Sequence, residues 1–224
     1  MLKSTHAQIL KLPTVSIIIA IYNRKDELFE LLNSLSHQTD KDFEIIIVDD
    51  GSKIDLRPTT ALFNESLNIQ FYRKDNTGPG LSRNYGARRA KNDWLVFVDS
   101  DVIVEKDYIE NIKKNITEIP CDAFGGADKA HKGFNLMQKA ISYSMTSVFT
   151  TGGIRGNKKA VTKFQPRSFN MGVKKSAFQA VGGFSEMRIG EDPDLSMTLW
   201  ENGFTTAFFD NIGVYHKRRV DFGN

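Results

Sequence analysis

The sequence W-L-V-F-V-D-S-D-V-I-V, residues 94–104, indicates how this chain folds. Its first five residues are large and apolar without polar alternation, which is typical of a central strand covered by helices on both faces. Asp99 and Asp101 follow at the carboxyl end of that strand, where open α/β sheets bind ligands. Two carboxylates one residue apart suit Mg²⁺ or Mn²⁺, and a capping turn is the alternative interpretation.

Composition limits the possible classes of protein. The chain has 224 residues, 40% of them hydrophobic, which predicts a single α/β domain over residues 1–224. Its 30 basic and 27 acidic residues nearly balance, so nucleic acid is not an expected partner. Cys121 is the only cysteine, which excludes an internal disulfide and favours a reducing, cytoplasmic compartment. No apolar run approaches the roughly 18 residues of a membrane span.

A strand, a helix and a second strand precede the central strand. Val15–Ile21 and Glu44–Val48 are β-branched runs of strand length, and four leucines between residues 28 and 35 recur at helical spacing. Asn23 is the expected cap of that helix, and Ile69–Arg73 is an expected edge strand. Neither a Gly-X-Gly-X-X-Gly motif nor a Walker lysine loop follows the first strand, so side chains must form any nucleotide pocket.

Three side chains in this half are candidates for nucleotide binding. Asp49 and Asp50 can accept the N3–H of a uracil or thymine ring, while an Asx turn in Asp-Asp-Gly-Ser is an equally good explanation. Arg83 lies in the first turn of a helix predicted over residues 81–91. From a helix start near the strand ends, its planar fork could reach a diphosphate or a base.

The second half is expected to add helices and two strands. Helical patterns cover residues 106–117 and 134–149, and residues 150–163 combine glycines with basic residues, as in a binding loop for an anion. Strands are predicted over residues 168–173 and, at a sheet edge, over residues 205–210.

The last predicted helix begins with a group of carboxylates. Pro193 suits the first helical position, which makes Asp192 the expected N-cap, and Gly203 ends the helix. Glu191, Asp192 and Asp194 place three carboxylates within four residues, more than capping requires. We therefore expect a functional role here.

Six motifs occur in one order, namely I-I-I-A-I-Y-N, V-D-D-G-S, G-L-S-R-N-Y-G, D-S-D, N-M-G and G-E-D-P-D-L. Over about residues 14–219 this order resembles the inverting family 2 glycosyltransferases. The resemblance implies a GT-A fold, with a nucleotide-binding, mostly parallel central sheet flanked by helices and a smaller acceptor-side region. About residues 14–104 would form the nucleotide-sugar-binding half, and about residues 105–219 the acceptor-binding, catalytic half.

The same resemblance implies roles for individual residues. Asp192 would be the catalytic base and Glu191 its acceptor-side neighbour. The metal, Mn²⁺ or Mg²⁺, would be held by Asp101 with Asp99 and His216. The nucleotide-sugar would be bound by Ile21, Tyr22, Asp49, Asp50, Arg83 and Asp99. The implied hexosyltransferase-type reaction moves a sugar from a nucleotide-diphospho-sugar, a UDP-sugar first of all, to a hydroxyl of a sugar or lipid-linked glycan, in glycan or polysaccharide biosynthesis.

Longer members of this family carry a Gln-X-X-Arg-Trp motif near the end of this region, as in processive synthases. Lys217, Arg218 and Arg219 stand there instead, so processive polymer synthesis is not expected. The chain stops at Asn224 without a capping or turn pattern. We therefore expect a longer protein whose missing C-terminal segment associates with the inner face of the cell membrane.

Two other classes of function remain open from the sequence alone. A sugar-phosphate nucleotidyltransferase uses a similar sheet but needs a glycine-rich phosphate loop after the first strand, which this chain lacks. An inactive nucleotide-sugar-binding module would keep the fold while losing carboxylates. Asp50, Asp99, Asp101 and Asp192 are all present, which favours an enzyme.

Overall fold

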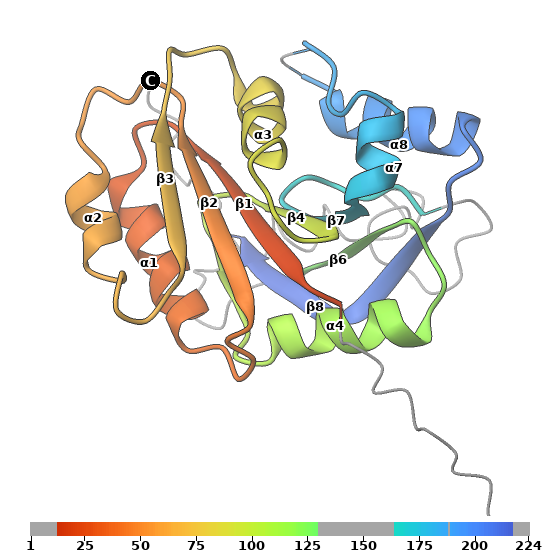
Figure 1. Ribbon diagram of the computed structural model, residues 1–224, viewed down its shortest axis with the longest axis horizontal. Helices are drawn as coiled ribbons and strands as arrows, with labels where there is room; N and C mark the ends of the chain where they lie inside the picture. Colours follow the sequence, from red (N-terminus) through yellow and green to blue (C-terminus); the bar gives the residue numbers. More distant parts are fainter. Residues whose placement is uncertain (1–12, 130–163, 188, 217–224) are drawn as a thin grey trace, which may run out of the picture.

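The computed structural model describes residues 13–129, 164–187 and 189–216 (Figure 1). Within them, one eight-stranded sheet has the order β3-β2-β1-β4-β7-β6-β8-β5. Its strands are β1 (Val15–Ile21), β2 (Phe43–Asp49), β3 (Ile69–Arg73), β4 (Trp94–Val98), β5 (Val102–Val104), β6 (Ala123–Lys129), β7 (Asn170–Lys174) and β8 (Thr206–His216). The helices are α1 (Lys25–Ser36), α2 (Arg57–Ala61), α3 (Pro79–Ala87), α4 (Tyr108–Glu118), α7 (Lys175–Ala180) and α8 (Glu191–Glu201).

Three sequence predictions fall on other parts of the chain. The helix predicted over residues 134–149, the loop of residues 150–163 and the basic residues 217–219 lie outside the described residues.

The four strands of the first half run parallel, with β1 between β2 and β4. All residues of β4 are buried, and the strand lies inside the sheet between β1 and β7, as its sequence predicts. Because parallel strands end at one edge of a sheet, Ile21 and Asp49, which pair with each other, and Val98 all end at the same edge. The residues that follow them are thereby brought together at that edge.

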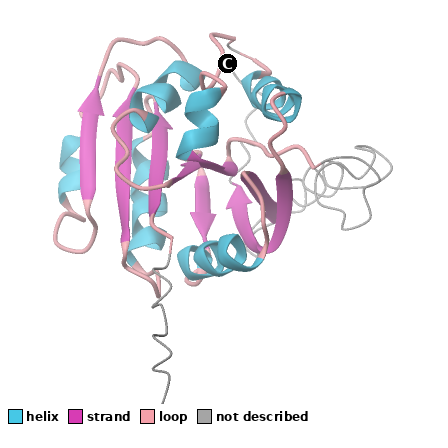
Figure 2. Ribbon diagram, turned by 45° about the vertical axis from the view of Figure 1, so that its right-hand side comes forward, coloured by secondary structure: helices cyan, strands magenta, loops and turns pink. Residues whose placement is uncertain are grey.

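Helices cover both faces of the sheet, as Figure 2 shows. Ile17 and Ile19 of β1 face a core shared with the leucines of α1 and with α4, whereas Ile18 faces a core shared with α3, α7 and α8. Each such isoleucine is fully buried and stabilises the fold by roughly 1.5–3 kcal/mol. This covering on both faces explains why the strand sequences are continuously apolar.

The second half of the sheet has mixed strand directions. β7 runs antiparallel to both β4 and β6, while β8 is parallel to β6 and antiparallel to β5. The strand predicted over residues 205–210 is present as the start of β8, whose residues 206–209 pair with β6 alone. The strand is longer than predicted, however, because it continues to His216 and its residues 214–216 also pair with β5. No strand was predicted where β6 lies. The edge position predicted for β3 is confirmed.

The starts of three helices differ from the sequence predictions. α8 begins at Glu191 after Gly190, whose φ of 90° is accessible to glycine without strain, so Asp192 is not the N-cap. α3 begins at Pro79, before the predicted residue 81, because proline has a helical φ at a first position. Asn23 does not cap α1, since its Oδ1 accepts the backbone N–H of Lys53 at 2.7 Å.

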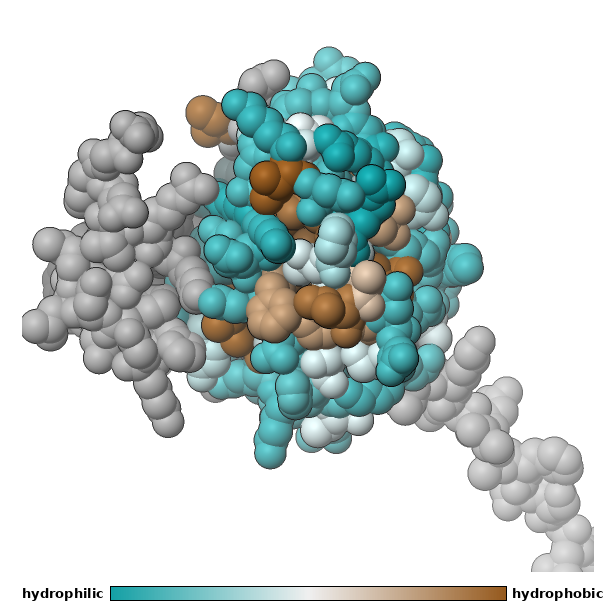
Figure 3. Space-filling view, turned by 90° about the vertical axis from the view of Figure 1, so that its left-hand side faces the viewer, coloured by the Kyte–Doolittle hydropathy of each residue, from teal (hydrophilic) through white to brown (hydrophobic). Residues whose placement is uncertain are grey.

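The face formed by α1, α2 and β3 is mostly polar and carries a small group of apolar side chains (Figure 3). Phe29 and Leu62 are exposed in this region, and the ring of Phe29 packs 5.4 Å from that of Phe63. None of the predicted site residues belongs to these three elements. Among the described helices, none has the length and apolar character needed to cross a membrane.

Candidate active site

A pocket of about 480 Å³ lies at the edge where β1, β2 and β4 end. Seven of the residues predicted for the site line it, namely Ile21, Tyr22, Asp50, Arg83, Asp99, Glu191 and Asp192. Asp49 is fully buried and does not line the pocket, and Asp101 and His216 lie beside it next to Asp99. The sheet thus gathers side chains that are up to 171 positions apart in the sequence, from Ile21 to Asp192.

The two aspartates at the end of β2 differ in their hydrogen bonds. Asp49 stabilises the turn that follows it, since its Oδ1 accepts the backbone N–H of Ser52, three residues on, at 2.8 Å. Asp50 accepts the backbone N–H groups of Thr77 and Gly78, each at 2.9 Å, and pairs with the Lys74 ammonium. Asp50 therefore holds the loop that leads into α3 and forms one wall of the pocket.

Arg83 connects the two halves of the site. Its Nη2 donates to Asp99 Oδ1 at 2.8 Å, and its Nη1 donates to Glu191 Oε1 at 3.0 Å. The side chain is only 6% exposed and packs against the ring of Phe184. Burial lowers the pKa of Arg83, but the charges of Asp99, Asp192 and Glu191 outweigh it and leave the pKa raised. Arg83 is therefore a permanent cation with two carboxylate partners.

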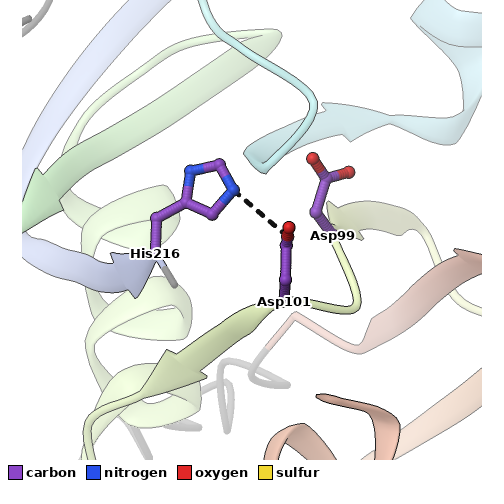
Figure 4. A group of neighbouring side chains, drawn as sticks. All are labelled: Asp99, Asp101 and His216. Carbon is purple, nitrogen blue, oxygen red and sulfur yellow. Dashed lines mark hydrogen bonds and ion pairs between the residues drawn. The ribbon is translucent and has the colours of Figure 1, made fainter. Parts of the chain in front are cut away.

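Asp99, Asp101 and His216 form a cluster beside the pocket (Figure 4). One ligand atom from each lies within 4.8 Å of the others. The loop after β4 brings the two carboxylates, and the register of β8, in which His216 pairs with Val102, brings the imidazole. Two carboxylates and one imidazole form a donor set of oxygen and nitrogen that fits Mn²⁺ or Mg²⁺ with further positions open.

The charged neighbours of Asp101 keep it ionised. Burial raises the pKa of Asp101, but the hydrogen bond and charge of His216 and the charge of Arg24 leave the pKa below its usual range. Burial lowers the pKa of His216, while Asp101, with smaller contributions from Asp128 and Asp99, leaves it raised. The His216 Nε2 lies 3.1 Å from Asp101 Oδ1.

Asp192 has the opposite environment on the other side of the pocket. Burial raises its pKa, and the charge of Arg83 and hydrogen bonds from the hydroxyl and backbone N–H of Ser168 only partly offset this effect. Among the described residues, its Oδ1 has no hydrogen-bond partner. A buried carboxylate with a raised pKa and a free acceptor oxygen is suited to taking up a proton.

Sequence reasoning missed three residues of this site. Arg24 pairs with Asp101, Lys74 pairs with Asp50, and Ser168 hydrogen-bonds Asp192. Arg24 follows β1 and Lys74 follows β3, and a charged residue just beyond the carboxyl end of a strand is a signal that could have identified both. Ser168 carries no comparable signal, because its contact depends on where α8 begins.

Taken together, the site has two chemically different sides. One side offers paired carboxylates, an imidazole and cations, which suits a metal and the phosphates of a nucleotide. The other side offers Asp192 as a proton acceptor. Such an arrangement can bind an activated phosphate ester on one side and deprotonate a hydroxyl on the other.

Comparison with known proteins agrees with this geometry. The family model for glycosyl transferase family 2 matches residues 16–182. An uncharacterized glycosyltransferase of Haemophilus influenzae is 33% identical over 206 residues, which cover 87% of this chain and 64% of the relative.

Two solved structures have the same fold. S. aureus TarS 1–349 in complex with UDP matches with a TM-score of 0.72 at 23% identity, covering 91% of this chain and 60% of that chain. The mannosyltransferase PcManGT from Pyrobaculum calidifontis, in complex with GDP-Man and Mn²⁺, matches with a TM-score of 0.72 at 16% identity, covering 92% and 57%.

The chain spans less than two thirds of the length of each of these three proteins. The likeness to the two solved structures, each under 25% identical, shows the GT-A fold. The family model covers most of the described sheet, including the strand ends that form the pocket. This chain therefore belongs to glycosyl transferase family 2 and is a glycosyltransferase domain of the GT-A fold.

Proposed function

We propose that this chain transfers a sugar from a UDP-sugar to a hydroxyl group with inversion at the anomeric carbon. The observation that carries the proposal is the position of Asp192 in the pocket, as a buried carboxylate with a free acceptor oxygen opposite the Asp99 cluster. Family membership and the UDP bound in a protein of the same fold support the choice of donor.

The donor is assigned to the half formed by residues 14–104. Ile21 and Tyr22 line the pocket at the end of β1 and would contact the nucleotide, and Asp50 would accept the N3–H of the uracil ring, whereas Asp49 is fully buried outside the pocket lining. Arg83 would support the ribose and diphosphate side through Asp99. A purine base is larger and carries its N–H donors at other positions, so it could not make this hydrogen bond to Asp50 in the same geometry.

The metal is assigned to Asp99, Asp101 and His216, whose ligand atoms lie within 4.8 Å of one another. A divalent cation bound there would neutralise the charge that develops on the departing diphosphate. To bind the cation, the ring nitrogen of His216 that faces Asp101 would have to be unprotonated. That nitrogen is the Nε2 that now lies 3.1 Å from Asp101 Oδ1.

The acceptor, a sugar or a lipid-linked glycan, is assigned to the half formed by residues 105–219. Asp192 takes the proton of the attacking hydroxyl while the new bond between the acceptor oxygen and the anomeric carbon forms. The bond between that carbon and the diphosphate oxygen breaks with its electron pair, which leaves with UDP. Glu191, held by Arg83, orients the start of α8 and with it Asp192. A single displacement of this kind inverts the configuration.

The proposal can be tested with a panel of UDP-, GDP- and TDP-sugars in the presence of Mn²⁺. A ligand that binds only the folded protein raises the midpoint of thermal unfolding, so UDP-sugars should give a larger increase than GDP-sugars. The anomeric configuration of the transfer product, measured by NMR, should be opposite to that of the donor. A larger increase with GDP-sugars would reject the uracil contact, and retention of configuration would reject the single displacement.

A further inference from the structure

Arg24 makes a contact that the proposed reaction does not use. Its Nη1 forms an ion pair with Asp101 Oδ2, while His216 Nε2 lies 3.1 Å from the other oxygen, Asp101 Oδ1. Both oxygens of this carboxylate are therefore occupied by cationic or hydrogen-bonding groups. With His216 among the ligands, a divalent cation could take the place of its hydrogen bond at Oδ1, but the Arg24 guanidinium on Oδ2 would then lie close to that cation.

Arg24 is placed to leave this contact without disturbing the core. It immediately precedes α1, its side chain is 29% exposed, and it lines the pocket. Asp101 is the only partner of its guanidinium among the described residues. The long side chain can therefore move within the pocket while the backbone of α1 stays in place.

A guanidinium and a divalent cation compete for the same carboxylate. Both are positive, so placing them together beside Asp101 is unfavourable without an anion in addition to Asp99, which is already paired with Arg83. A diphosphate in the pocket would supply that anion, because guanidinium groups bind phosphate oxygens through two parallel hydrogen bonds. Arg24 would then have a better partner than Asp101, and the carboxylate would be free for the metal.

We propose that Arg24 exchanges its ion pair with Asp101 for the diphosphate of the donor, which makes the donor and the divalent cation bind cooperatively. This inference rests on the proposed function, because it needs a diphosphate in the pocket. Coupling between two ligands is reciprocal, so the donor strengthens metal binding by the same factor by which the metal strengthens donor binding.

The cooperativity can be measured through Mn²⁺ binding without any turnover. The dissociation constant of Mn²⁺ is measured by electron paramagnetic resonance with and without UDP, for the native chain and for Arg24→Gln. UDP should tighten Mn²⁺ binding to the native chain by roughly 5- to 150-fold, the usual range of such coupling. In Arg24→Gln, Mn²⁺ alone should bind about tenfold more tightly, and the factor gained with UDP should fall about tenfold.

Arg57→Gln is the matched control, because it removes an exposed ion pair, that with Asp55, away from the pocket. It should keep both Mn²⁺ dissociation constants of the native chain. Arg24→Lys keeps the positive charge but loses the planar fork. In the absence of UDP it should bind Mn²⁺ as weakly as the native chain does, and UDP should strengthen Mn²⁺ binding less than in the native chain. It also serves as the second variant if Arg24→Gln does not fold.

The outcomes separate the inference from the proposed function. If the native chain binds neither Mn²⁺ nor UDP, the proposed function is wrong, and the inference falls with it. If both bind but Arg24→Gln leaves the coupling factor unchanged, the exchange is wrong and the proposed function stands. Weaker binding of Mn²⁺ alone by Arg24→Gln would also overturn the exchange, since it would mean that Arg24 holds Asp101 ready for the metal.

Discussion

The carboxylates on the two sides of the pocket differ in how completely they are paired. On the donor side, Asp50 accepts two backbone N–H groups and pairs with Lys74, and both oxygens of Asp101 have partners. On the acceptor side, Asp192 keeps one oxygen without a hydrogen bond among the described residues. The pKa of Asp101 is lowered and that of Asp192 is raised. Its charged partners thus lower the pKa of Asp101, whereas burial with incomplete pairing raises that of Asp192.

Arg83 lies between these two sides and contacts both. It holds Asp99 on one side and Glu191, the residue before Asp192, on the other. The difference between the sides therefore depends on one buried arginine as well as on the carboxylates themselves. Substitutions of Arg83 or of these carboxylates can therefore change how the two sides of the pocket differ.

The largest effect is expected from Asp192→Asn. Asparagine keeps the shape of the side chain but cannot take up the proton, so the rate of transfer should fall by about 10²- to 10⁴-fold. Since Gly190 and not Asp192 is the N-cap, the free energy of unfolding should change by less than about 1 kcal/mol. Initial rates and chemical denaturation measure the two quantities.

Asp194→Asn is the control for this prediction, because it removes a carboxylate from the same helical turn outside the pocket lining. It should transfer sugar at nearly the native rate. Near-native transfer by Asp192→Asn together with loss of transfer by Glu191→Gln would identify Glu191 as the base.

Arg83→Met should remove the connection between the sides. It leaves Asp99 and the buried Glu191 without their cation, and breaking a buried ion pair typically costs roughly 3–5 kcal/mol. Because Asp99 is 31% exposed, we expect the lower end of this range in urea denaturation. Arg57→Met, which removes an exposed pair, should unfold at the native urea concentration. A loss below about 1 kcal/mol for Arg83→Met would show that the bridge is not stabilising.

Asp101→Asn tests the paired side. Removing one negative charge from the cluster should weaken Mn²⁺ binding by at least about 10- to 100-fold. Losses of this size are typical even for residues that only hydrogen-bond to a metal ligand. Calorimetry with UDP present measures this change. Asp55→Asn, which removes a carboxylate on the surface, should bind Mn²⁺ as the native chain does. Equal affinities for the two variants would exclude Asp101 as a ligand.

The smallest effect is expected from Ser168→Ala and appears in the dependence of kcat/KM on pH. A base must be ionised, so the rate falls as the pH drops through its pKa, and burial places that fall above the usual range of an aspartate. The Ser168 hydroxyl lowers the pKa of Asp192. Its removal should move the acid limb to higher pH by about 0.5–1 unit, equivalent to one net hydrogen bond.

Ser168→Thr keeps a hydroxyl and should restore the native acid limb. If the acid limb of Ser168→Ala moved to lower pH or did not move, the Ser168 hydroxyl would not be what lowers the pKa of Asp192.

The sequence predicts the parallel half of the fold well and the mixed half less well. β1, β2 and β4 are predictable because a strand buried on both faces must be apolar throughout, and such runs are easily recognised. β6 was missed because A-F-G-G-A-D-K contains two glycines. Side chains of Phe164 and Asn170 lie where a Cβ on Gly125 or Gly126 would be, so the glycines serve close packing between segments distant in the sequence.

The residues of the candidate site were also predictable only in part. Residues directly after strand ends, such as Asp50 and Asp99, were identifiable because the position of a strand end is set by local sequence. The partners of these residues were not, since Arg24 and Asp101 are separated by 77 positions. The start of α8 was misplaced because proline suggested one boundary and a glycine with positive φ set another. Contacts of this kind depend on the folded chain.

Gly86 determines how closely α3 approaches the sheet, and Arg83 lies one turn before it on the same helix. A Cβ at position 86 would come within 2.7 Å of the Cγ2 methyl of Ile18 and 3.3 Å of that of Val48. Any larger residue would lift the helix and carry the arginine away from its two carboxylates. Through this one missing methyl group, the geometry of the charged site is tied to the packing of an apolar core. Natural variation at Gly86 should therefore be as restricted as variation at a residue that touches the substrate.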